Sequence, residues 1–208
     1  MDWYVRLEQG RACGISLQTI EKLAEALHLT DQESEHLCIL AKVDSRAAAA
    51  KNISPTMETF LRTIDSPAYV LGPRWDILLW NQAAAELLGI EALNPEKKNL
   101  LVYLFDDPRG KLLLGGHWET EVQRILAQFR SVYDRFPGDQ GFQELVAGLL
   151  HDSQDFKRLW ARHDVKFRSS GKKELRHPTQ GIVEYSYLSF HPAEDSELTL
   201  VVYLRSDL

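Results

Sequence analysis

The chain has 208 residues, of which 44% are hydrophobic and 26% are charged, and its formal net charge at pH 7 is −6. This composition suits one or two globular domains and excludes disordered and fibrous proteins. The acidic balance excludes a protein that binds nucleic acid over its whole surface, because phosphates are neutralised by clustered Lys and Arg. Two cysteines without a CxxC motif exclude a disulfide framework and a cysteine-based zinc site.

Apolar runs in the sequence fall short of the ~20 residues of a membrane span. No signal-peptide pattern opens the chain, so we expect a cytoplasmic protein.

Two short helices are predicted within residues 16–43. Apolar residues recur at helical spacing in the first, and Ser16 is its candidate N-cap. Thr30 and Glu33 follow as a capping box, in which each side chain accepts a hydrogen bond from the other residue's backbone amide. Two helices joined by a tight turn are therefore expected.

A linker is predicted over residues 44–55, where an alanine-rich stretch precedes a change of sequence pattern. At its end, Ser54 and Pro55 indicate the start of a helix, because Pro is favoured at the first helical position. Residues 1–50 hold five Lys and Arg against eight Asp and Glu, so the N-terminal part is not a basic arm.

From residue 68 the pattern becomes that of a sheet. Ala68–Leu71 and Asp76–Trp80 have the length and composition of strands, and a Gly-Pro turn signal separates them. Asn81 is then expected to cap a helix over Gln82–Leu88, which Gly89 ends.

The pattern of residues 118–163 predicts helices, and strands are expected at Val165–Arg168, Gly181–Phe190 and Leu198–Leu204. The apolar run Leu100–Phe105 has the length of a strand. Two strands, a helical insertion and three further strands predict an α+β fold, with helices packed on one side of an antiparallel sheet.

One basic segment lies between Lys157 and His177, and two interpretations of it are open. It can be the charged edge of a hairpin, which protects a sheet against aggregation, or an anion-facing rim around a pocket. Its cations, opposed only by Asp164 and Glu174, are Lys157, Arg158, Arg162, Lys166, Arg168, Lys172, Lys173 and Arg176.

The sequence contains no recognisable catalytic or metal-binding motif. HExxH, GxSxG, P-loop and GxGxxG patterns are missing. The pair His151–Asp152 is similar to ligand pairs of metal phosphohydrolases, but no companion histidine pairs precede it. We therefore expect neither an enzyme nor a metal or cofactor. A hydrolase that uses His151 or His163 is the remaining enzymatic alternative.

Aromatic residues lie on the apolar faces of nearly every predicted element. Most of them are expected in the core, because large aromatic side chains dominate ordinary cores. A small sheet with one helical face and this many rings can also enclose an elongated apolar cavity.

Two stretches resemble known families. Asp76–Gly89 resembles the strand-to-helix opening of a PAS sensor domain, and Trp3–Arg11 with Ser16–Ala41 resembles the second half of an Xre-type helix-turn-helix. Together with further motifs, the order over residues 3–204 is similar to that of the MmyB-like transcription regulators. Those motifs are Pro67–Val70, Asn99, Phe105–Pro108, Trp118, Phe129–Arg130, Ser153, Phe156, Leu159–Val165 and His177–Pro178.

The resemblance implies a domain order and a function. It implies the C-terminal part of an Xre-type helix-turn-helix over residues 1–43, the linker over 44–55, and a PAS-like ligand-binding domain over 56–208. It also implies a bacterial transcription regulator that forms a homodimer and responds to a fatty-acid-like molecule. The main alternative is a protein-interaction or dimerisation module that binds no ligand.

The sequence departs from the family at its N-terminus. In the family, further helices and the start of the recognition helix precede the Trp-Tyr motif, which stands here at residues 3–4. A helix-turn-helix reads bases with the N-terminal residues of its second helix. We therefore expect this chain alone to bind operator DNA weakly or not at all, with Arg6 and Arg11 as candidate contacts to phosphates.

The ligand is expected between the sheet and the helical insertion, the two surfaces large enough to enclose an acyl chain. Arg130 and His163 are the candidate carboxylate-binding residues, because each lies one residue beyond an apolar helical position. A structural role for both, as bridges between helices, is the alternative. The rings expected to face the ligand are those of Trp80, Phe105, Phe129, Trp160 and Tyr185.

Overall fold

The structure is a computed structural model that describes residues 17–30, 33–34, 37, 53–94, 98–162, 171–193 and 195–206. The chain divides into two compact units, Met1–Asn52 and Ile53–Leu208. This division falls inside the predicted linker.

In the first unit, helix α2 covers Leu17–Ala26 and is followed by the predicted capping box. The backbone amide of Thr30 donates to Glu33 Oε2 over 2.9 Å, and the amide of Glu33 donates to Thr30 Oγ1 over 3.4 Å. Glu33 itself is helical. The sequence pattern therefore located this helix start correctly.

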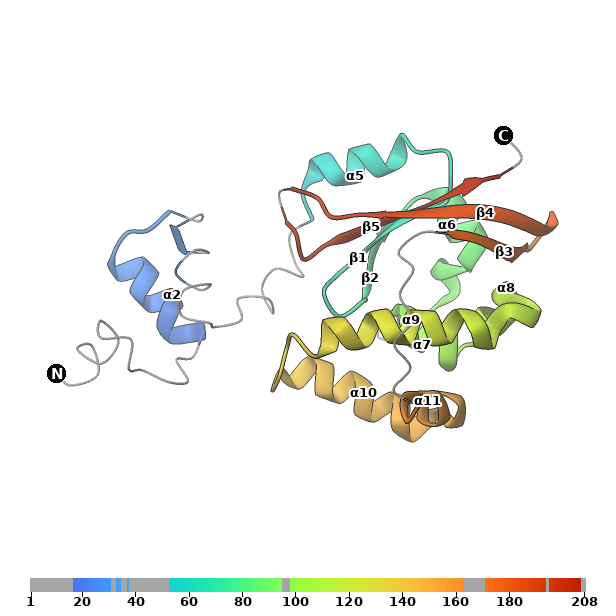
Figure 1. Ribbon diagram of the computed structural model, residues 1–208. Helices are drawn as coiled ribbons and strands as arrows, with labels where there is room; N and C mark the ends of the chain where they lie inside the picture. Colours follow the sequence, from blue (N-terminus) through green and yellow to red (C-terminus); the bar gives the residue numbers. More distant parts are fainter. Residues whose placement is uncertain are drawn as a thin grey trace. The chain divides into compact units, whose positions relative to one another are not determined.

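A five-stranded antiparallel sheet forms the centre of the second unit, in the order β2-β1-β5-β4-β3 (Figure 1). Strand β5 pairs with β1, so strands from the two ends of this unit's sequence lie side by side in the sheet. Strand β3 forms one edge. The expected α+β fold is confirmed. The strands are β1 (Ala68–Leu71), β2 (Ile77–Trp80), β3 (Gly171–His177), β4 (Gly181–Phe190) and β5 (Thr199–Arg205).

The helices between β2 and β3 form a layer on one face of the sheet (Figure 1). Side chains of Asn81, Asn99, Asp107, Asp139 and Ser153 accept hydrogen bonds from first-turn amides and so fix five helix starts. Among the described residues, no helix is long and apolar enough to cross a membrane. The helices are α6 (Gln82–Leu88), α7 (Leu100–Phe105), α8 (Pro108–Leu114), α9 (Trp118–Tyr133), α10 (Gln140–Asp152) and α11 (Gln154–Trp160), with 3-10 turns at Ile90–Ala92 and Gly115–His117.

Helix α5 (Pro55–Arg62) lies on the opposite face of the sheet (Figure 1). Its Leu61 packs with Ala68 and Val70 of β1. The alternate residues of β1, Tyr69 and Leu71, belong to the main core, which includes the helical insertion. The prediction of helices on one side only was therefore wrong. Strand β1 is covered on both faces, which explains why its sequence is uniformly apolar.

Two further sequence predictions need correction or fall outside the described residues. Leu100–Phe105 forms helix α7 rather than a strand, and the side chain of Asn99 caps it by accepting from Leu101 N over 2.9 Å. A short enclosed helix is apolar on most sides, so periodicity does not separate it from a buried strand. The strand expected at Val165–Arg168 lies outside the described residues, and sequence analysis did not identify β3 at Gly171–His177.

Candidate functional site

A cavity of about 330 Å³ lies between the inner face of the sheet and helices α7, α8 and α9. Volumes of ~300–1,000 Å³ are typical of small-molecule pockets. Its walls are mainly apolar and include Leu104 of α7, Leu114 of α8, Ile125 of α9 and Val201 of β5. The cavity thus lies on the face of the sheet where the sequence placed a ligand, but of the expected insertion over residues 119–163 only α9 and Arg135 line it, and α7 and α8 form the rest of the helical wall.

Four tyrosines contribute to the walls: Tyr69, Tyr187 and Tyr203 from the sheet, and Tyr103 from α7. The hydroxyls of Tyr69 and Tyr203 lie 3.5 Å apart. Burial, followed by the neighbouring Tyr203, raises the pKa of Tyr69 well above its ordinary value, and burial also raises the pKa of Tyr103. These two hydroxyls therefore stay neutral at physiological pH and can donate or accept hydrogen bonds within an apolar wall.

A buried cation from β3 also reaches the cavity wall. The side chain of Lys173 is 9% exposed, and its Nζ lies 3.3 Å from Glu121 Oε2 on α9 and 4.3 Å from the centre of the Tyr187 ring. Burial lowers the pKa of Lys173, but the nearby Tyr203 and Glu121 outweigh burial and raise it above the ordinary value. Lys173 is therefore charged at physiological pH.

The mouth of the cavity is polar. It is lined by Ser131 of α9, by Arg135 two residues beyond that helix, by Ser189 of β4 and by His191 just beyond that strand, and all four residues are exposed. His191 Nδ1 lies 3.0 Å from the carbonyl oxygen of Leu198. The site therefore combines an apolar interior, an inner cation and a solvent-facing polar rim.

The cavity is lined by none of the six sequence-predicted residues that the structure describes. Phe105, Phe129 and Trp160 meet instead within the helical layer, around Phe156. Ring centres are 5.1 Å apart for Phe105 and Phe156, 5.2 Å for Phe156 and Trp160, and 6.3 Å for Phe129 and Trp160. These rings pack the core of the insertion.

Arg130 bridges two helices, the alternative role that the sequence left open. From α9 it donates hydrogen bonds to the carbonyl oxygens of Leu159 and Trp160 at the end of α11. Its guanidinium carbon lies 4.6 Å from the centre of the Trp160 ring. Arg130 thus ties α9 to the C-terminal end of α11.

The remaining predicted residues lie apart. Tyr185 is buried on β4 with its ring centre 6.1 Å from that of Tyr203, and Trp80 on β2 carries Lys98 Nζ 4.4 Å from its ring centre. His163, Arg6 and Arg11 lie outside the described residues.

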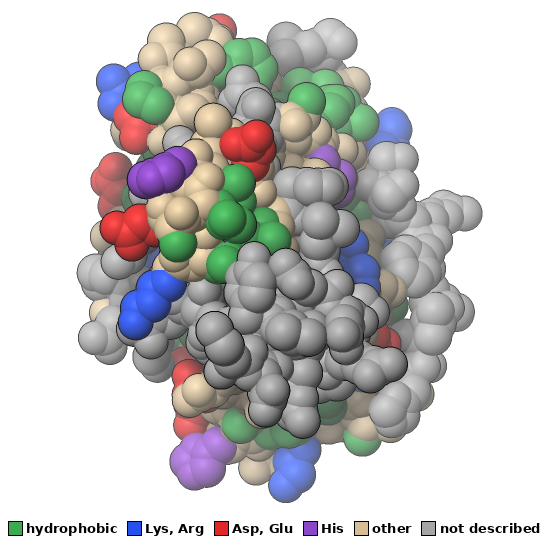
Figure 2. Space-filling view, turned by 90° about the vertical axis from the view of Figure 1, so that its left-hand side faces the viewer, with side chains coloured by type: hydrophobic (Ala, Val, Ile, Leu, Met, Phe, Trp, Pro, Cys, Tyr) green, Lys and Arg blue, Asp and Glu red, His purple; other side chains and the backbone are tan. Residues whose placement is uncertain are grey.

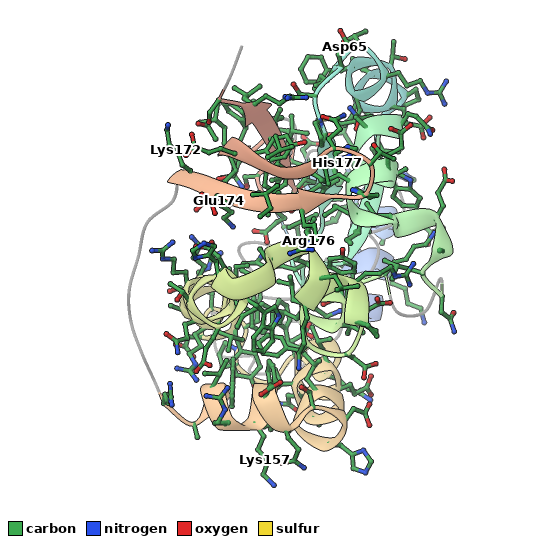
Figure 3. The ribbon with its side chains drawn as sticks, turned by 90° about the vertical axis from the view of Figure 1, so that its right-hand side faces the viewer. Asp65, Lys157, Lys172, Glu174, Arg176 and His177 are labelled. Atoms are coloured by element: carbon green, nitrogen blue, oxygen red, sulfur yellow. The ribbon has the colours of Figure 1, made fainter. Side chains whose placement is uncertain are left out.

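The basic segment does not form one surface in the described part of the chain. In Figure 3, Lys157 projects from α11, on the far side of the helical layer from Lys172 and Arg176 on β3. Lys172 Nζ pairs with Glu184 Oε1 over 2.7 Å across the β3–β4 hairpin. Figure 2, which views the opposite side of the molecule, shows described Lys and Arg side chains near Asp and Glu side chains. The hairpin-edge interpretation therefore fits Lys172, whereas Lys173 of the same strand is buried in the cavity wall.

The described residues hold no cluster of three or more His, Cys, Asp or Glu side chains suited to a metal ion. His151 Nδ1 lies 2.8 Å from Asp152 Oδ1 at the end of α10, and both side chains are exposed. This pair does not line the cavity.

Residues 53–206 match the family model of the MmyB-like transcription regulator ligand binding domain. The chain belongs to this family. The matched range covers the unit that carries the cavity, so the MmyB-like domain and the candidate site coincide.

Solved structures similar to the MmyB-like domain include two PAS domains. One, from a Desulfitobacterium hafniense protein, is 12% identical with a TM-score of 0.33 and covers 70% of this chain and 95% of that chain. The other, from Bordetella pertussis BvgS, is 10% identical with a TM-score of 0.30 and covers 72% of this chain and 83% of that chain. No curated protein matches the chain.

None of the residues that line the cavity of this MmyB-like domain was among the predicted ligand-binding residues, and Lys173 was named only within the basic segment that could form an anion-facing rim. A sequence signal existed for Lys173: in a strand it faces the same side as the apolar Leu175, and Lys172 faces the other side. This signal can be recognised only once β3 has been located. Tyr69 and Tyr103 carried no such signal, because a tyrosine in a core and a tyrosine in a cavity wall look alike in sequence.

Proposed function

We propose that the MmyB-like domain is the sensor of a ligand-responsive transcription regulator and binds a fatty-acid-like molecule in this cavity. The observation that carries the proposal is an apolar cavity of about 330 Å³ with a buried cation, Lys173, in its wall. An amphiphile with an apolar tail and one anionic headgroup complements both features, since an anion in an apolar cavity is stabilised by a nearby cation.

In this proposal the protein acts in the cytoplasm as a homodimeric regulator of operator DNA, without enzymatic activity. The ligand changes regulation only as far as it binds one conformation better than another. A ligand that contacts both the sheet and α9 meets this condition when the spacing between them differs between conformations.

Native mass spectrometry tests for the ligand most directly. The full chain is measured as purified, after extraction with organic solvent, and after addition of dodecanoate as a probe. We expect a mass increment that extraction removes, or one dodecanoate bound per chain after addition. A chain that carries nothing and takes up no dodecanoate contradicts the proposal.

A cavity-filling pair of variants tests the location. Ile125 lines the cavity on α9, whereas Leu150 packs on the same main core from α10 without lining the cavity. We expect Ile125→Trp to abolish dodecanoate binding and Leu150→Trp to preserve it. Circular dichroism confirms that both variants fold. Equal binding by the two variants places the ligand elsewhere.

A second candidate function, that of a dimerisation module that binds no ligand, is favoured by exposed apolar side chains on the outer face of the sheet. Leu188 and Phe190 of β4 and Leu204 of β5 are 38%, 51% and 40% exposed on the face where α5 lies. Phe190→Ser should lower the mass measured by light scattering from that of a dimer to that of a monomer. A wild-type chain that is monomeric at all concentrations rules this function out.

A further inference from the structure

We propose that Lys173 binds the anionic headgroup of the ligand, and that Glu121 is the ion-pair partner of Lys173 when the cavity is empty. Ligand binding would then replace an ion pair between β3 and α9. This inference rests on the proposed function, because it specifies the headgroup chemistry and what binding changes at the same site.

The charges at this corner of the cavity do not balance. Glu121 is 6% exposed and forms ion pairs with two cations, Arg124 through Oε1 and Lys173 through Oε2. Two cations thus share one carboxylate: Arg124 is 45% exposed and partly solvated, whereas Lys173 is buried. A single anion therefore completes the cluster, and of the two cations it is Lys173 that lines the cavity.

The groups that face Lys173 supply no second negative charge among the described residues. They are Tyr187 from β4, Tyr203 from β5 and Glu121 from α9. The charged neighbours on β3 have other partners: Lys172 pairs with Glu184, and Glu174 Oε2 lies 3.2 Å from His117 Nε2.

The ion pair between Lys173 and Glu121 also lacks the geometry of a hydrogen bond. Although the two atoms are 3.3 Å apart, Glu121 Oε2 is buried and accepts no hydrogen bond within the described part of the chain. A buried acceptor without a hydrogen bond is costly. A ligand carboxylate can approach Lys173 from the open side of the cavity, while Glu121 keeps Arg124.

This exchange would release the contact between the edge strand and the first turn of α9. Glu121 lies in that first turn, and α9 also supplies Ile125, Gln128 and Ser131 to the cavity. The same helix therefore senses both the tail and the headgroup.

The experiment compares dodecanoate with dodecan-1-ol, which has the same tail without the charge. Dissociation constants are measured by calorimetry for the full chain and its variants. We expect Lys173→Met to weaken dodecanoate binding by about tenfold or more, the range of a charge-assisted hydrogen bond, and to leave dodecan-1-ol binding unchanged. Lys172→Met, which removes a neighbouring charge that pairs with Glu184 outside the cavity, should change neither constant.

Glu121→Gln tests the competition with the opposite sign. Removing the charge that competes for Lys173 should tighten dodecanoate binding by about threefold or more, with no effect on dodecan-1-ol; weaker or unchanged dodecanoate binding overturns the exchange. This variant keeps the proposal testable if Lys173→Met does not fold. Arg135→Met at the cavity mouth tests the rival anion site, and a selective loss of dodecanoate in that variant instead overturns the assignment of Lys173.

The outcomes separate this inference from the proposed function. If the wild-type chain binds neither dodecanoate nor dodecan-1-ol, the proposed function fails. If it binds both and Lys173→Met leaves the ratio of their constants unchanged, the cavity remains the ligand site and the role of Lys173 is overturned.

Discussion

At the scale of single residues, Asn81 connects three segments of the fold with one side chain. Its Oδ1 accepts from Ala84 N over 2.9 Å, as the N-cap of α6, and from Ala68 N over 3.0 Å on β1. Its Nδ2 donates to the carbonyl oxygens of Ile64 and Ser66 over 2.6 and 2.8 Å. The sequence predicted only the cap, because the other three bonds join residues that are distant in the chain.

We predict that Asn81→Ala lowers the free energy of unfolding by about 2–4 kcal/mol, because four backbone groups in a buried place lose their partner. Ser54→Ala, which removes a single cap bond to Met57 N on α5, should cost about 1 kcal/mol. Urea denaturation of both variants gives the comparison. A loss for Asn81→Ala no greater than for Ser54→Ala would show that water replaces the missing bonds.

At the scale of elements, α7 and α8 form one wall of the cavity and meet closely at Gly110. A Cβ atom built on Gly110 would lie 2.8 Å from Leu104 Cα and would also meet the carbonyl oxygen of Tyr103. Both obstacles belong to the backbone of α7 and cannot rotate away. The two helices therefore depend on a residue without a side chain at this contact.

We expect Gly110→Ala to destabilise the protein by about 1–3 kcal/mol through overpacking and to weaken dodecanoate binding, because Tyr103 and Leu104 line the cavity. Gly148 on α10 is the matched control, since a Cβ there meets nothing within 4 Å. Gly148→Ala should stabilise the protein by about 0.5–1 kcal/mol. Thermal and urea denaturation distinguish the signs; stabilisation by both substitutions would contradict the close approach.

Helix α11 is tied to α8 through Asp155, and this tie is pH-dependent. Asp155 Oδ2 lies 2.6 Å from Lys111 Nζ, and the hydrogen bond from Lys111 lowers the pKa of Asp155 below its ordinary value of 3.8. A carboxyl group whose pKa is lower in the folded state stabilises the fold above its unfolded pKa. That contribution is lost as the pH falls through the folded pKa.

We predict that Asp155→Asn lowers the free energy of unfolding by about 0.5–1 kcal/mol at pH 7, the range of partly exposed ion pairs. The difference from the wild-type chain should shrink as the pH falls below the ordinary pKa of 3.8 and disappear once the carboxylate is protonated in the folded state as well. Asp152→Asn, which removes a charge paired with the adjacent His151, is the control. A difference that persists at low pH would assign the effect to packing rather than to charge.

At the scale of the whole molecule, the local sequence signals were sufficient for much of the fold but not for the site. Caps at Asn81 and Ser54 and alternation in β4 located elements correctly, because these signals act between near neighbours. The cavity depends on how β1, β3, β4 and β5 pack against α7–α9, and no local sequence pattern specifies this tertiary packing. The aromatic clusters were visible in sequence, but whether a ring packs a core or borders a cavity is decided by tertiary packing.

Because the cavity forms only where the sheet packs against the helices, ligand binding should stabilise the folded protein. The cavity exists only when β1, β5 and α9 are assembled, so a ligand binds the folded unit and not the unfolded chain. We predict that dodecanoate at 100 times its dissociation constant raises the free energy of unfolding by about 2.7 kcal/mol. This corresponds to a rise in Tm of roughly 5–10 °C for a protein of this size.

The concentration dependence checks this prediction by differential scanning fluorimetry. Once the folded site is saturated, Tm should continue to rise with the logarithm of the dodecanoate concentration, because the ligand still acts by mass action against unfolding. Measurements must stay below the micelle concentration, and dodecyl trimethylammonium, with the same tail and opposite charge, is the control for detergent effects. A Tm that stops rising above saturation would mean that dodecanoate also binds the unfolded chain, and a Tm that falls would mean that it binds the unfolded chain more strongly than the cavity.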